Sequence, residues 1–323
     1  MTERIDLVTV GSLFVEITPS TPGEQLSSAH HYTLVAGGAA ANVVFALAKL
    51  GVNVNFITAV GDDDFGTFLE NELISFGIST SGVRRIPQQL TPVSFCAVDL
   101  QGGKQFSFYR FPGWCSPMEK LTADDFSAVR ACRLFDFSEG SIREAVLRPQ
   151  VFAGAREARQ HGASVLYAVN LRKRSWRLPD DEIRAIEREA ITLADIIILN
   201  EEEVNFITGQ AGEVGMDHIR ALGPQVVVMT RGGDGDILVK ANEKTAAVPP
   251  YQVPVIYDVG AGDTFSAGLV AAVLQHDIPT MSFADWVDAA CFGAATAAIR
   301  VSTSADPHDL PSYNQVRAWM EQK

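Results

Sequence analysis

Residues 260–268 read GAGDTFSAG. Apolar residues follow at helical spacing, among them Phe265, Leu269 and Val273, so the glycine-containing turn opens a helix. The first N–H groups of a helix have no partner within it and lie at the positive end of the helix dipole. Small residues let a ligand approach such a backbone closely. The stretch therefore favours a site for a phosphoryl oxygen.

Asp263 falls in the first turn of this predicted helix. The dipole keeps a carboxylate ionised there, so it is able to accept the proton of a hydroxyl. Taken alone, residues 260–263 fit this site and a plain loop with an N-capping aspartate equally well. The rest of the chain has to decide between the two.

Away from this stretch, short apolar runs alternate with longer amphipathic segments. This alternation is typical of βα units around a mostly parallel sheet. We expect an α/β fold, a three-layer α/β/α sandwich with helices on both faces of the sheet. The expected strands lie at 5–10, 54–57, 134–137, 164–167, 196–199 and 226–229. The expected helices lie at 40–50, 65–76, 151–161, 181–190 and 263–274.

Two regions depart from this rhythm, 14–34 and 91–110, where polar and apolar residues alternate. A period of two suits half-exposed antiparallel strands. We interpret them as a small β-lid whose strands lie approximately within 12–34 and 91–112; two ordinary edge hairpins are the alternative. No repeat or interdomain linker is visible, so we expect one domain over 1–323.

Charge and composition limit the partners. The formal net charge of −13 argues against nucleic acid and anionic membranes, because the summed field repels phosphates. No apolar run approaches the roughly 20 residues of a membrane span. The charged N-terminus does not resemble a secretory signal. The four cysteines lack paired metal spacing, which favours reduced thiols in a cytoplasmic protein.

A second glycine motif, Gly37-Gly38, precedes a predicted helix that carries Asn42 near its start. Adjacent glycines expose backbone to a ligand, and an asparagine amide both donates to and accepts from sugar hydroxyls. The alternative is an alanine-rich helix start packed tightly on the sheet.

Five motifs stand in a recognisable order and spacing. They are Gly37-Gly38, Gly61-Asp62-Asp63-Asp64-Phe65-Gly66, Asn200-Glu201-Glu202-Glu203, Thr230-Arg231-Gly232-Gly233-Asp234-Gly235 and Gly260-Ala261-Gly262-Asp263. With them the chain resembles the PfkB (ribokinase-like) carbohydrate kinases over essentially its whole length. The three aspartates do not form an EF-hand calcium loop, because Thr67 and Leu73 stand where glycine and glutamate are needed.

The resemblance implies catalytic and nucleotide-binding roles. Asp263 is implied as the base, with the amides of Gly260, Ala261 and Gly262 as the anion hole for the γ-phosphoryl group of ATP. Asn200 and Glu203 match an element that organises Mg²⁺, Glu203 through water. A charged helix start is the alternative for residues 201–203. The nucleotide-binding loop is implied to contain Thr230, Gly232 and Gly235, where an ordinary turn is the alternative.

For the sugar, the resemblance implies Glu16, Gly37, Gly38, Asn42, Arg110 and Arg172. Glu16 stands where the family usually has an aspartate that holds sugar hydroxyls. Residues 109–110, residues 170–172 and Trp176 resemble elements of fructokinases and 2-keto-3-deoxygluconate kinases. The arginines suit a ketose oxygen, a carboxylate or a phosphate, or else pair with carboxylates between lid and body. We expect a fructokinase-like activity, with 2-keto-3-deoxygluconate next and a nucleoside or polyol third.

The chain departs from the family beside the catalytic motif. Tyr257-Asp258 replaces an Asp-Thr pair whose acid commonly serves a monovalent-cation site, and a phenol carries no charge near neutral pH. The later loop 303–307 lacks the usual Gly-Ala pair, and Ala168 replaces an acid. We therefore expect weak or absent activation by K⁺.

These departures leave open a second class, a sugar-binding protein on a kinase scaffold. An oxidoreductase is less favoured, because no G-x-G-x-x-G follows the first strand. Lid strands of the family often pair between subunits, so the resemblance also implies a homodimer through the lid.

Overall fold

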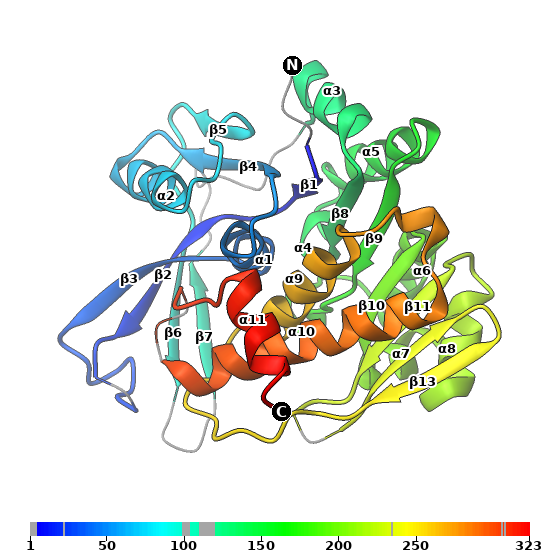
Figure 1. Cartoon of the computed structure of the whole chain (residues 1–323). Helices are drawn as coiled ribbons and strands as arrows, with labels where there is room; N and C mark the ends of the chain where they lie inside the picture. The colour runs from blue at the N-terminus through cyan, green and yellow to red at the C-terminus, as the bar shows by residue number, and fades with distance from the viewer. Residues whose placement is uncertain are drawn as a thin grey trace.

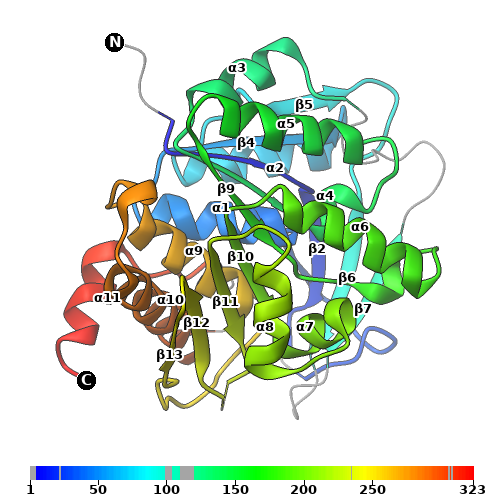
Figure 2. The ribbon, with the colours of Figure 1, turned by 90° about the vertical axis from the view of Figure 1, so that its right-hand side faces the viewer.

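The main sheet of the protein is mostly parallel and has helices on both faces (Figures 1 and 2). The computed structural model describes residues 5–21, 23–98, 104–109, 120–233, 235–304, 306 and 308–323. Within these ranges nine strands form the sheet, in the order β13-β12-β11-β10-β9-β8-β1-β4-β5. The predicted three-layer α/β/α fold is confirmed.

The strands of the main sheet are β1 Leu7–Val10, β4 Val54–Gly61, β5 Val83–Ile86, β8 Leu134–Ser138, β9 Ser164–Ala168, β10 Ile196–Asn200, β11 Val226–Thr230, β12 Ile237–Ala241 and β13 Lys244–Val248. All six predicted strands are present, and their pairings with one another are parallel. Three strands at the edges, β5, β12 and β13, were not predicted. The pairings β11–β12 and β12–β13 are antiparallel.

Two groups of helices cover the sheet. One face carries α1 Ala39–Lys49, α2 Asp64–Ser75, α9 Ala261–Val273, α10 Phe283–Thr303 and α11 Tyr313–Met320. The other carries α3 Ala123–Ala131, α4 Glu139–Ile142, α5 Arg148–Gln160, α6 Asp180–Thr192, α7 Glu201–Thr208 and α8 Gly212–Arg220. The five predicted helices correspond to α1, α2, α5, α6 and α9, and their ends differ by at most a few residues.

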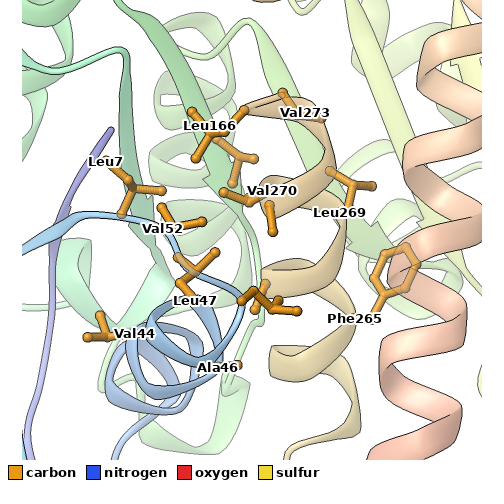
Figure 3. Close-up of a cluster of buried hydrophobic side chains, with 14 of the residues drawn as sticks. Leu7, Val44, Ala46, Leu47, Val52, Leu166, Phe265, Leu269, Val270 and Val273 are labelled. Carbon is orange, nitrogen blue, oxygen red and sulfur yellow. The ribbon is translucent and has the colours of Figure 1, made fainter. Parts of the chain in front are cut away.

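The core strands are mostly apolar because both of their faces are buried. Thr9 of β1 and Asp136 of β8 are buried exceptions, and the Thr9 hydroxyl donates to the Asp136 carboxylate. Alternate residues point to opposite faces: Ile196 packs in the α9 layer, whereas Ile197 packs against the helices of the other face. Figure 3 shows part of the hydrophobic core on the α9 face of the sheet, where Leu47 of α1 and Val270 of α9 lie over the strands. No helix in the described ranges combines the length and the hydropathy needed to cross a bilayer.

A second, smaller sheet forms the predicted lid. Its strands are β2 Phe14–Pro19, β3 Tyr32–Gly37, β6 Val93–Val98 and β7 Lys104–Tyr109, in the order β3-β2-β6-β7. The two hairpins are antiparallel, but β2 and β6 pair in parallel, which the period-two pattern did not reveal. The strand β3 also extends beyond the predicted limit of 34. Because β2 and β6 pair, the two hairpins form one four-stranded sheet and not two separate edge hairpins.

Helices α9 and α10 pack closely through two glycines. A Cβ on Gly268 would lie 2.5 Å from Thr296 Oγ1, and one on Gly293 would lie 2.8 Å from the carbonyl oxygen of Phe265. Gly260 and Thr264, at the start of α9, line one cavity together with Arg300, which lies in the last turn of α10. The C-terminal end of α10 therefore lies beside the N-terminal end of α9.

Candidate active site

The glycine motif of residues 260–263 opens α9 as predicted, although the helix begins at Ala261, two residues earlier than expected. Gly260 precedes it with φ 81°, in the left-handed region that glycine enters without steric cost. This turn places Asp263 in the first helical turn, where the positive end of the dipole favours its ionised form.

Two asparagines hold the Asp263 carboxylate. Asn42 Nδ2 donates to Oδ2 at 2.8 Å, and Asn170 Nδ2 donates to Oδ1 at 3.2 Å. Burial raises the pKa of Asp263 to about 6, and these hydrogen bonds, together with the positive charge of Arg172, oppose that rise. Asp263 is therefore ionised near neutral pH, yet it binds a proton more tightly than an ordinary aspartate does.

The three predicted anion-hole amides are not equivalent. The N–H of Ala261 donates to the carbonyl of Asp258 at 3.2 Å, within the turn. Gly262 and Asp263 lie in the first turn, whose N–H groups have no partner inside a helix. A Cβ on Gly262 would meet no described atom within 4 Å, so an anion can approach there. In this conformation the amide of Ala261 is the least available of the three.

A cavity lies beside this loop and joins the lid to the helical layer. It is lined by Glu16, Val35, Ala36, Gly37, Asn42, Tyr257, Val259, Gly260, Thr264, Arg300, His308 and Leu310. Burial, together with the charge of Asp263, raises the pKa of Glu16 to about 7. The cavity thus holds a carboxyl group that titrates near neutral pH.

Steric constraints explain the adjacent glycines Gly37 and Gly38. Gly38 has φ 122°, and a Cβ there would lie 2.4 Å from the carbonyl oxygen of Ser12. A Cβ on Gly37 would lie 3.1 Å from Glu16 Cβ. Tight packing therefore accounts for Gly38, and a side chain on Gly37 would press on Glu16 and Phe14 beside the cavity.

A second group of predicted residues lies where β10 and β11 end. Asn200 and Thr230 are in register on these neighbouring parallel strands, so both stand at the carboxyl edge of the sheet. Arg231 Nη2 lies 3.2 Å from Glu201 Oε1 and links the loop after β11 to the start of α7. Gly232 has φ 77° in the same loop. Open α/β sheets bind ligands at this edge.

Asn200 and Glu203 form a capping box at the start of α7. Asn200 Oδ1 accepts from the N–H of Glu203 at 2.9 Å, and Glu203 Oε2 accepts from the N–H of Asn200 at 2.8 Å. The other oxygen, Oε1, accepts from the N–H of Leu171 at 2.7 Å. Glu203 therefore ties α7 to the loop that carries Asn170 and Arg172.

This donor set limits how Mg²⁺ can be held. Within the described ranges, no three His, Cys, Asp or Glu residues gather in a way that could hold a metal ion. Glu203 is buried and already accepts two backbone hydrogen bonds. These residues fit a magnesium ion held mainly by phosphate oxygens and water, as is usual for Mg²⁺, with Glu203 acting through water.

Only some of the residues predicted to contact the sugar lie together in the structure. Glu16 and Asn42 share the cavity, and the charge of exposed Arg172 acts on Asp263 from the loop after β9. Arg110 lies outside the described residues. The hydrogen bond from Asn170 to Asp263 was not predicted. The φ of 45° at Asn170, a conformation that asparagine tolerates better than most residues, marks a tight turn that the sequence does not reveal.

Comparisons with known proteins agree with this geometry. The family model described as pfkB family carbohydrate kinase matches residues 4–312. The chain is 30% identical to fructokinase-2 of Zea mays, over 84% of this chain and 81% of that protein. It is 22% identical to the 5-dehydro-2-deoxygluconokinase of Clostridium tetani, over 99% of this chain and 94% of that protein.

A solved structure of a double-mutant fructokinase from Vibrio cholerae, with fructose, ADP and a potassium ion bound, is 26% identical to this chain. It superposes with a TM-score of 0.82 and covers 98% of this chain and 99% of its own. The family match spans the glycine motif of the lid, the capping box of α7 and the first turn of α9. The chain belongs to the pfkB family of carbohydrate kinases and is an ATP-dependent carbohydrate kinase.

Proposed function

We propose that this kinase phosphorylates a hydroxyl of a ketose, in the manner of a fructokinase, with Asp263 as the catalytic base. The observation that carries the proposal is the position of Asp263. Its carboxylate is held by Asn42 and Asn170 at the N-terminus of α9, beside the cavity that Glu16 and Asn42 line. A base and an anion site at one helix end suit transfer of a phosphoryl group to a hydroxyl.

In the proposed reaction the γ-phosphoryl group of ATP passes directly to the hydroxyl of the sugar. Asp263 takes the proton of the attacking hydroxyl, whose oxygen forms a bond to the γ-phosphorus of ATP. The bond between that phosphorus and the oxygen bridging to the β-phosphate breaks, and ADP leaves with the electron pair. First-turn amides at Gly262 and Asp263 stabilise negative charge on the transferred group.

ATP and Mg²⁺ are the proposed co-substrate and cofactor. We place the nucleotide over the ends of β10 and β11, in contact with Thr230, Gly232 and Gly235. Glu203 is proposed to orient water bound to Mg²⁺, and the ion would neutralise phosphate charge. The capping box supports this role by fixing the Glu203 carboxylate against α7.

Two observations support a ketose. The Zea mays and Vibrio cholerae relatives are named fructokinases, and the latter was solved with fructose bound. Glu16, which lines the cavity, can accept hydrogen bonds from sugar hydroxyls, and exposed Arg172 offers a fork of donors for a carbonyl or carboxylate oxygen. Arg110 remains a proposed sugar contact from the lid.

A keto sugar acid such as 2-keto-3-deoxygluconate is the second candidate. It is favoured by the Clostridium tetani relative, named a 5-dehydro-2-deoxygluconokinase, which matches over 99% of this chain. Arg172 suits a carboxylate as well as a ketose oxygen. A nucleoside or polyol is less favoured.

A coupled assay of ADP release distinguishes these substrates. Fructose, 2-keto-3-deoxygluconate, a purine nucleoside and a polyol are compared by kcat/KM at equal ATP and Mg²⁺. We expect the highest value with fructose. The highest value with the sugar acid would favour the second candidate, and turnover of the nucleoside alone would contradict a ketose kinase.

Four further features are part of the proposal. Residues 1–323 act as one catalytic domain, and the protein works in the cytoplasm, where Cys132 and Cys291 remain free thiols. Two chains form a homodimer through the lid, where Tyr32 and Leu34 are exposed on its edge strand β3. Activation of turnover by K⁺ is weak or absent.

A further inference from the structure

The C-terminal end of α10 holds a buried positive charge beside the catalytic loop. Arg300 is 1% exposed and lies in the last turn of α10. It lines the same cavity as Gly260, Thr264 and Glu16. An arginine is almost never buried so fully without a specific arrangement around it, and its guanidinium stays protonated in proteins.

The contacts of Arg300 join α10 to the segment before the anion hole. Its Nη1 donates to the carbonyl of Ser304 at 3.0 Å, and its Cζ lies 5.5 Å from the centre of the Tyr257 ring. A cation at this distance from an aromatic face is attracted to it. The C-terminal end of the α10 dipole favours a positive charge at the same place.

The backbone makes a second connection between the same elements. The carbonyl of Val301 accepts from the N–H of Ile256 at 2.7 Å and from that of Tyr257 at 3.2 Å. Tyr257 is therefore fixed by both its backbone and its ring, and Gly260 follows three residues later. A shift of Arg300 would be transmitted to the loop that opens α9.

A bound monovalent cation does not fit these residues. Such an ion needs negative or carbonyl oxygens, whereas burial raises the pKa of the Tyr257 phenol well above its usual range, so it stays neutral. The carbonyl of Ser304 already accepts from Arg300. A second positive charge beside a buried guanidinium would also be repelled.

We propose that the guanidinium of Arg300 is a built-in cation, which supports the 260–263 loop in place of a bound monovalent cation. Arg300 is a positioning residue: it fixes Tyr257 and supplies a permanent positive charge beside the anion site. The inference rests on the proposed role of that loop. It explains why the family's acidic residue has been exchanged for Tyr257, since a carboxylate is no longer needed to bind an ion.

The test compares the parent enzyme, Arg300→Met, Arg300→Lys and the exposed control Arg156→Met. Values of kcat and KM are measured in choline, sodium, potassium and guanidinium chloride at one ionic strength. We expect the parent and the control to be indifferent to the cation. Arg300→Met should lose about tenfold to a hundredfold in kcat, the size of a lost interaction with a charged group. Potassium or guanidinium should restore part of the lost kcat of Arg300→Met, whereas choline should restore none. Arg300→Lys should retain a higher kcat than Arg300→Met.

Thermal unfolding shows which variants are folded, and Arg300→Gln replaces Arg300→Met if the latter does not fold. Full kcat in a folded variant without the charge would overturn the inference. So would a large, saturable stimulation of the parent by K⁺, which needs no variant. Asp263→Asn is assayed in parallel: if it keeps full turnover, the proposed function fails, whereas an inactive Asp263→Asn with a fully active Arg300→Met removes only the inference.

Discussion

The side-chain amide of Asn42 donates to the carboxylate of Asp263 at 2.8 Å, although 221 positions separate the two residues. One stands at the start of α1 and the other at the start of α9, and both helices cover the same face of the sheet. The glycine motif that ends the lid and the motif of residues 260–263 thus lie side by side in the fold. Asn170 binds the second carboxylate oxygen from the loop after β9.

Asn170→Gly tests how this arrangement sets the acidity of the base. Glycine accepts the φ of 45° without strain, but it removes a hydrogen bond to the ionised carboxylate, so the pKa of Asp263 rises above about 6. Asp263 must be ionised to act as the proposed base, so the acid limb of kcat/KM moves to higher pH. A shift of about half a unit to one unit lowers kcat/KM near pH 6 by about two- to fivefold.

Asn242→Gly is the matched control for that profile. Asn242 also has a positive φ, 53°, but lies in the exposed turn between β12 and β13. We expect its profile to superpose on that of the parent enzyme. An unshifted acid limb in Asn170→Gly would show that this amide does not influence the base.

Glu16→Gln tests the carboxyl group of the cavity. The pKa of Glu16 is raised to about 7, so the group gains its charge as the pH rises through neutrality, and a charged acceptor binds hydroxyls more strongly. The KM of the parent for the sugar should therefore fall between pH 6 and 8. In the variant it should be about tenfold higher at pH 8, as for one lost charged hydrogen bond, and independent of pH. A parent KM that does not vary with pH would contradict this role.

Glu203→Gln tests the proposed role toward Mg²⁺. The exposed neighbour Glu202→Gln is its control, since it changes the same charge on the same helix turn. Loss of a residue that orients metal-bound water typically weakens metal affinity by about tenfold to a hundredfold. We expect the Mg²⁺ concentration for half-maximal rate to rise in Glu203→Gln alone. If the two variants need the same Mg²⁺ concentration for half-maximal rate, Glu203 serves only as the N-terminal cap of α7.

Leu34→Glu tests the proposed homodimer. Leu34 is 41% exposed on the edge strand β3 of the lid. A charge in an apolar interface should produce monomers in light scattering after size exclusion, whereas Thr33→Glu, which points to the opposite face of the strand, should remain dimeric. A monomeric parent protein would end the proposal.

Sequence patterns predicted the parts of the fold that depend on local chemistry. Continuous apolar runs marked the six core strands, because strands buried on both faces have no polar side. Alternation marked the lid, and the glycine turn marked the start of α9. The edge strand β5, which reads Val-Arg-Arg-Ile, was missed because its polar residues hide the pattern.

What the sequence could not predict depends on contacts between distant segments. β2 pairs in parallel with β6, and the alternation of polar and apolar residues in a strand does not indicate which other strand it will pair with. Asn170 reaches Asp263 only after a backbone turn of unusual φ. Arg300 lies in a helical segment where a charged residue is expected to face water, yet it is buried against Tyr257.

The kcat of Asp263→Asn tests the central claim most directly. The substitution keeps the size of the side chain and removes its ability to take a proton, and Asp288→Asn, at an exposed position on α10, is the control. We predict that kcat falls by about a hundredfold to ten-thousandfold, as for loss of a general base, while nucleotide binding by calorimetry is unchanged. An Asp263→Asn enzyme that turns over as fast as the parent would contradict the assignment of Asp263 as the base.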